Sequence, residues 1–71
     1  MKATDSRIND LLSFGEYIEL MDEYLGEIGR KSSGEYMMSD TECRCVSYPK
    51  DKSEKKLTVI INYKEQSIEI C

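Results

Sequence analysis

The sequence contains no histidine and only three cysteines, Cys43, Cys45 and Cys71. A tetrahedral zinc site needs four ligands, so these thiols leave it incomplete without a carboxylate or a second copy of the chain. A papain-like nucleophile needs a histidine to activate it, and we therefore expect no catalytic cysteine. Cys43 and Cys45 share one face of a predicted strand, roughly 7 Å apart, which is too far for an easy disulfide. We expect structural thiols and keep a metal- or redox-responsive site at the three cysteines as the weakest hypothesis.

Long apolar runs and the motifs of common catalytic sites are also missing. No stretch is long enough to span a bilayer, and Met1-Lys2-Ala3 leads directly into polar residues, unlike a signal peptide. The sequence has no phosphate-binding glycine loop, no H-E-x-x-H zinc motif and no calcium loop. We therefore expect a cytoplasmic protein that is not an enzyme, holds no metal or cofactor and binds no membrane.

Large apolar side chains are scarce. Leu, Ile, Val and Phe together number fifteen of 71 residues, close to the composition at which disorder sets in. A chain of this length forms one domain and buries only about 60% of its unfolded surface, so its stability is marginal. Small proteins with a thin core often gain stability from a partner or from dimerisation.

The longest segment with helical periodicity covers residues 13–29. Its apolar residues recur at spacings of three and four, on one stripe made of Ile18, Met21, Leu25 and Ile28. Ser13 followed by Glu16 fits a capping box, and Gly29 marks the end. The apolar stripe extends back through residues 4–12, whereas the cap at Ser13 favours an interruption. We predict a helical region over residues 4–30 with a kink near residues 13–15.

The opposite side of this helix carries five carboxylates, which we call the acidic face: Glu16, Glu19, Asp22, Glu23 and Glu27. No Lys or Arg lies between residues 16 and 27, so the repulsion is unrelieved within the helix. Burial of a few apolar side chains, at roughly 1.5–3 kcal/mol each, outweighs that repulsion. The acidic face is either a solvated surface that keeps the protein soluble or a patch that awaits a cationic partner.

Three strands are predicted in the second half of the chain, over residues 41–48, 57–63 and 66–71. Alternation places Cys43 and Cys45 on one face of the first strand, which Pro49 ends. A Lys-rich flexible connector follows over residues 50–56. The predicted fold class is α+β, with the N-terminal helix packed on a three-stranded antiparallel meander and all 71 residues in one domain.

The last two strands form a predicted hairpin. A two- or four-residue connection at residues 64–65 or 63–66 would place Ile61 opposite Ile68 and Val59 opposite Ile70. The final strand would then be an uncovered edge, which invites another strand. Ile60 points away from the predicted core. We therefore take Ile60, Ile70 and Cys71 as a candidate contact for homodimers.

The net charge of −4 argues against direct binding of nucleic acid and favours basic protein surfaces. Our leading hypothesis is a non-enzymatic inhibitor that uses the acidic face, as a nucleic-acid mimic, to bind the basic nucleic-acid site of another protein. Anti-defence proteins of phages or mobile elements, and some antitoxins, provide the analogy. The alternative is a homo-oligomeric structural or accessory protein whose contact is the sheet edge.

Overall fold

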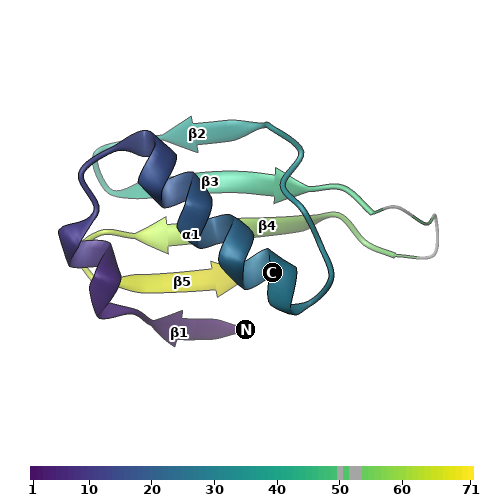
Figure 1. Cartoon of the computed structure of the whole chain (residues 1–71), viewed down its shortest axis with the longest axis horizontal. Helices are drawn as coiled ribbons and strands as arrows, with labels where there is room; N and C mark the ends of the chain where they lie inside the picture. Colours follow the sequence, from purple (N-terminus) through teal and green to yellow (C-terminus); the bar gives the residue numbers. More distant parts are fainter. Residues whose placement is uncertain (50, 52–53) are drawn as a thin grey trace.

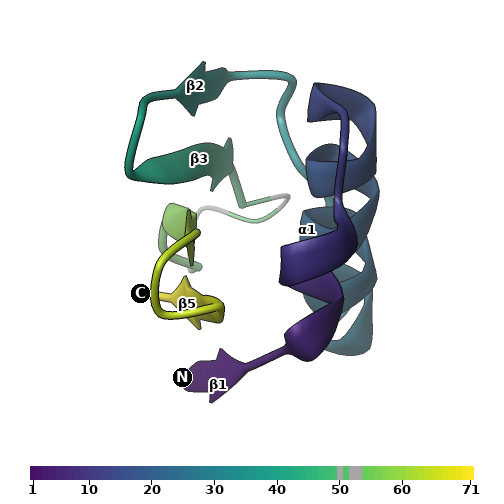
Figure 2. The same cartoon turned by 90° about the vertical axis from the view of Figure 1, so that its left-hand side faces the viewer.

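Among its described residues, the computed structural model of the chain has a five-stranded antiparallel sheet with a single α-helix on one face (Figures 1 and 2). The structure describes residues 1–49, 51 and 54–71. In chain order the elements are β1 (Lys2–Thr4), the 3₁₀-helix η1 (Ser6–Asp10), α1 (Phe14–Glu27), β2 (Tyr36–Met38), β3 (Glu42–Ser47), β4 (Leu57–Asn62) and β5 (Ser67–Ile70). The strand order across the sheet is β1-β5-β4-β3-β2. The α+β class is therefore confirmed.

The predicted three-stranded meander corresponds to β3, β4 and β5, but the sheet has two further strands. β2 pairs with β3, and β1 pairs with the outer side of β5, where Ala3 lies opposite Ile68. Strand β5 is therefore not an edge, contrary to the prediction for residues 66–71. The edges are β1 and β2, each three residues long, and such short edges offer little template for another strand.

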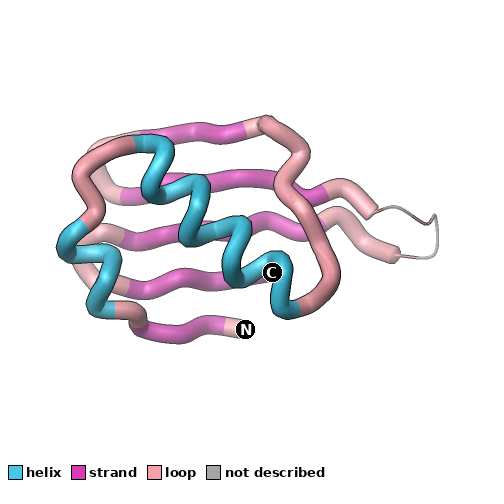
Figure 3. Tube along the Cα trace, viewed as in Figure 1, coloured by secondary structure: helices cyan, strands magenta, loops and turns pink. Residues whose placement is uncertain are grey.

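The helical region predicted for residues 4–30 is two helices with an extended segment between them (Figure 3). Leu11 ends η1 with ψ 127° and Ser13 precedes α1 with ψ 157°, so the predicted kink is a complete break. The Ser13 hydroxyl accepts from the Glu16 N–H, and the Glu16 carboxylate accepts from the Leu12 N–H. Neither helix is long and apolar enough to cross a bilayer, within the described residues.

The helix ends in a Schellman motif. Gly29 adopts φ 73°, which suits glycine, and the Arg30 N–H donates to the Leu25 carbonyl at 2.8 Å. This bond and the Gly29 N–H to Gly26 carbonyl bond satisfy carbonyls that the helix end would otherwise leave unpaired. The chain then turns away from α1 toward β2.

The core lies between α1 and the sheet. Its buried apolar residues come from η1, α1 and the three central strands: Ile8, Leu20, Met21, Leu25, Cys43, Cys45, Val59, Ile61, Ile68 and Ile70. The predicted hairpin register is confirmed, since Val59 pairs with Ile70 and Ile61 with Ile68. Residues 63–66 connect the two strands. Alternation along β3 and β4 directs every second side chain into this core. Among the described residues, no helix covers the other face of the sheet (Figure 2).

The predicted connector over residues 50–56 joins β3 to β4. Residues 50, 52 and 53 of this connector lie outside the described residues. Its base is tied to the helix end by Arg30, whose side chain is 11% exposed. The Arg30 guanidinium donates to the backbone carbonyls of Ser47 and Lys55, both at 2.9 Å. The buried Ser47 hydroxyl donates in turn to the Lys31 carbonyl at 2.6 Å. Arg30 therefore links the end of α1 to the end of β3 and to the segment that leads into β4.

Arg30→Ala is expected to lower the free energy of unfolding by about 1.5–3 kcal/mol, because hydrogen bonds from charged donors contribute about that much. Urea denaturation followed by circular dichroism measures the change. The matched control is Lys31→Ala, since the exposed Lys31 side chain has no hydrogen bond or ion pair in the described part of the chain. An equal loss in both variants would show that the Arg30 side chain does not hold these segments together.

Candidate functional site

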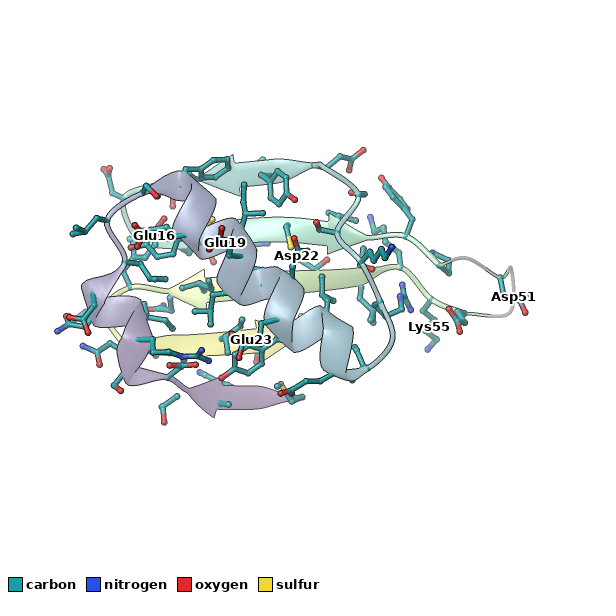
Figure 4. The ribbon with its side chains drawn as sticks, viewed as in Figure 1. Glu16, Glu19, Asp22, Glu23, Asp51 and Lys55 are labelled. Carbon is teal, nitrogen blue, oxygen red and sulfur yellow. The ribbon has the colours of Figure 1, made fainter. Side chains whose placement is uncertain are left out.

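The acidic face lies on the side of α1 that points away from the sheet. The helix repeat of 3.6 residues places the acidic and apolar stripes on opposite sides, and Met21 and Leu25 on the apolar stripe are completely buried. Figure 4 shows Glu16, Glu19, Asp22 and Glu23 spread along the length of the helix. The sequence-predicted carboxylates are therefore presented together by one rigid element.

Glu23 forms an ion pair with a residue outside α1. The Arg7 guanidinium, from η1, donates to both Glu23 carboxylate oxygens at 2.9 and 3.2 Å. The same guanidinium donates to Asp5, with a shortest contact of 2.7 Å. Arg7 therefore bridges two carboxylates and holds η1 beside α1.

Asp5 anchors this bridge. Its side chain is 9% exposed and also accepts from the Arg7 backbone N–H at 3.0 Å and from the Tyr24 hydroxyl at 2.9 Å. Hydrogen bonds from the Arg7 side chain hold the pKa of the Asp5 carboxyl well below its usual range, although burial opposes them. Burial, together with the hydrogen bond to Asp5, raises the pKa of Tyr24. Asp5 is thus charged and fully hydrogen-bonded at neutral pH.

The other four carboxylates of the acidic face have no ion-pair partner in the part of the chain that the structure describes. Glu16 is half-buried and engaged in the N-terminal cap, whereas Glu19, Asp22 and Glu27 are exposed. Glu27 is the last residue of α1, where the helix dipole disfavours a negative charge. Asp22 borders a hollow of about 410 Å³ that Arg30 and Lys31 also line.

A second hollow, of about 370 Å³, lies between η1 and α1. Its charged lining residues are Arg7, Glu16, Glu19 and Glu23, and its apolar lining residues are Leu11 and Leu20. Leu20 is 5% exposed, so the hollow has a buried apolar wall beneath charged rims. This arrangement suits a long side chain with an aliphatic stem and a cationic head.

The three cysteines do not converge. Cys43 and Cys45 are buried under α1, and burial raises the pKa of the Cys45 thiol to about 12. Cys71 is exposed and continues the ladder beyond β5, where its backbone pairs with Thr58. Within the described residues no group of three or more potential metal ligands lies close together.

The candidate oligomer contact is divided between two faces of the sheet. Ile60 and Cys71 lie on the face that α1 does not cover, whereas Ile70 is 8% exposed and belongs to the core. Their positions follow from strand alternation, because Ile70 pairs with the core residue Val59 and Ile60 pairs with Glu69. The structure therefore brings Ile60 together with Cys71 but not with Ile70.

Asp5 and Arg7 are the residues that sequence reasoning missed at this site. Arg7 lies sixteen residues before Glu23, so helical spacing could not connect them. The available signal was the absence of cations within residues 16–27, which meant that any cation paired with these carboxylates had to come from another element.

Comparison with known proteins found no matching family model, no curated protein of similar sequence and no similar solved structure.

Proposed function

We propose that the protein is a small non-enzymatic binding module that engages a basic surface of another protein through the acidic face of α1. The supporting observation is that Glu16, Glu19, Asp22 and Glu27 have no ion-pair partner in the described part of the chain. Like charges at helical spacing repel one another by a few tenths of a kcal/mol per pair. A cationic partner surface would relieve that repulsion.

The hollow between η1 and α1 gives this contact a specific anchor. A lysine or arginine of the partner would lay its stem on Leu11 and Leu20 and direct its charge toward Glu19. The remaining carboxylates would steer the approach, so that binding weakens as salt rises. Basic surfaces of this kind occur where proteins hold nucleic acid, and inhibition by occupying such a site is the biological role we propose. We also propose a cytoplasmic location, where the free thiols would stay reduced.

Charge reversal at two unpaired positions tests the proposal. Glu19→Lys with Glu27→Lys is expected to weaken binding to a basic partner at least tenfold and to flatten the dependence of binding on salt. We avoid Glu23, since its reversal would set a lysine against Arg7 and disturb the packing of η1. The measurement is affinity capture from the native cell, followed by titration of the captured protein at several salt concentrations.

The matched control reverses two exposed carboxylates elsewhere, with Asp10→Lys and Asp40→Lys. Neither residue has an ion pair in the described residues, and the variant has the same net charge as the test variant. Equal loss of binding in both variants would show that net charge, and not the acidic face, determines binding. Unchanged binding in the test variant would show that the acidic face serves only solubility.

A further inference from the structure

The face of the sheet opposite α1, which we call the open face, carries an ordered row of side chains across all five strands. The register pairs Lys2 with Glu69, Glu69 with Ile60, Ile60 with Arg44 and Arg44 with Met37. Ile60 stands at the centre of this row, on β4. A cation and a carboxylate flank it at equal separation, because Arg44 is on β3 and Glu69 is on β5.

A neighbouring row on the open face is uncharged. Cys71 pairs with Thr58 through two backbone hydrogen bonds of 2.9 and 3.0 Å, and Thr58 pairs with Val46. A hollow of about 720 Å³ extends from Thr58 and Val46 over Arg44 to Met37, a residue that is 69% exposed. The open face therefore combines a narrow apolar strip with many polar and charged side chains. Ile60 borders a second hollow of about 320 Å³, whose other lining residues are all polar or charged: Lys2, Glu42, Arg44, Asn62, Glu65, Ser67 and Glu69.

The two rows complement themselves when the open faces of two copies are placed against each other. The two-fold axis of this arrangement lies midway between the two sheets and runs parallel to β4. Such an axis exchanges β3 with β5, so Arg44 of each copy meets Glu69 of the other, and Val46 meets Cys71. Ile60 and Thr58 meet their own counterparts on the axis. An axis across the strands would instead place Arg44 against Arg44, and like charges opposite one another are unfavourable. Charge complementarity thus selects one of the two orientations.

We infer that the open face binds a second copy of this chain in a two-fold dimer in which Arg44 pairs with Glu69 of the partner. Glu69 forms no salt bridge within the described residues, although Lys2 is its cross-strand neighbour, and Arg44 forms a partly exposed contact with Glu42 at 3.1 Å. Facing sheets pack about 10 Å apart and rotate by about 30°. Arg44 and Glu69 lie one strand from the axis, so this rotation displaces them by less than the reach of an arginine.

The open face is one of the two broad sides of the molecule, which measures 35 × 20 × 16 Å over the whole chain and is viewed in Figure 1 down the shortest of these axes. The sheet itself is a smaller patch, because its strands lie about 4.8 Å apart and the longest have six residues. The contact would therefore bury less than the roughly 800 Å² per partner of a standard interface, and the expected dimer depends on concentration. The helix side is a poorer self-contact, because the five carboxylates of the acidic face would meet their own copies. In the dimer both acidic faces point outward, and they remain available to other proteins.

Reciprocal charge reversal tests the pairing. Sedimentation of the full chain is expected to show a concentration-dependent dimer, whose dissociation constant rises at least tenfold in Arg44→Glu and in Glu69→Arg. The double variant restores the pair with its charges exchanged, so its dissociation constant returns to within about threefold of the original. The net-charge controls are Lys64→Glu in the turn and Glu27→Arg on the acidic face, both of which should dimerise normally.

A cross-linking measurement covers the case in which a charge variant fails to fold. In a Cys71→Ser background, Ile60→Cys is expected to give a covalent dimer with a short bis-maleimide, because Ile60 lies on the axis, whereas Lys64→Cys should not. A wild-type chain that stays monomeric at all concentrations, single reversals that stay dimeric, or a double variant that stays monomeric would each overturn the inference. None of these outcomes bears on the acidic face, whose own variants report on the proposed function separately.

Discussion

Leu25→Ala is expected to lower the free energy of unfolding by about 2–5 kcal/mol. Leu25 is completely buried between α1 and the sheet, so truncation removes apolar contacts and leaves a cavity. Natural domains are stable by only about 5–15 kcal/mol, and a chain of this size falls toward the lower limit. The variant should therefore be largely unfolded at moderate temperature, which thermal denaturation followed by circular dichroism measures.

The matched control for this prediction is Ile28→Ala on the same apolar stripe. Ile28 caps the carboxyl end of α1 and is 53% exposed, so its truncation should cost less than about 1 kcal/mol. Similar losses in the two variants would contradict the described packing of the helix. The comparison also separates a core residue from a peripheral one, a difference that their helical spacing alone does not reveal.

The parts of the fold that could be predicted are those defined by local signals. Ser13 and Glu16 mark the start of α1 because a capping box satisfies backbone groups within four residues. The register of β4 and β5 follows from the match between their apolar faces, since a slip of one residue would expose Ile61 and Ile68. These features require no knowledge of the rest of the chain.

The outer strands could not be predicted in the same way. Three residues are too few to display a period of two, and β1 offers only Ala3 as an inward side chain. Its strand conformation depends on hydrogen bonds to β5, which lies at the other end of the sequence. Strand β2 likewise depends on its pairing with β3. Tertiary pairing decides such segments.

The candidate site shows the same division between local and distant information. Helical spacing was sufficient to group the carboxylates of the acidic face, and it could not assign the pairing of Glu23 with Arg7. That pairing requires η1 to fold back beside α1, which depends on the break at Ser13 and on burial of Ile8. The acidic face is consequently less negative than the sequence suggested, with its unpaired charges at Glu16, Glu19, Asp22 and Glu27 among the described residues.

Asp5→Ala is expected to lower the free energy of unfolding by about 2 kcal/mol. The loss of an N-cap costs about 1 kcal/mol, and the loss of the Tyr24 hydroxyl's acceptor costs about 1 kcal/mol more. Arg7 would also lose its closest partner, so η1 would be held less firmly beside α1. Urea denaturation measures the change. Ser6→Ala is the control, since Ser6 is exposed and its hydroxyl has no hydrogen bond within the described residues.

The pH dependence of Asp5→Asn isolates the charge from the shape of this side chain. Because folding lowers the pKa of Asp5, its charge contributes stability above its unfolded pKa of about 3.9, and that contribution is lost as the pH falls toward the folded-state pKa. We therefore expect the wild type to lose more stability than Asp5→Asn as the pH falls below this value. Lys2 also lowers the pKa of Glu65, but this exposed pair contributes little, so Glu65→Gln should keep most of the acid dependence. A weaker acid dependence in Glu65→Gln than in Asp5→Asn would place the controlling carboxylate in the β4–β5 turn and remove the assigned role of the Asp5–Arg7 bridge.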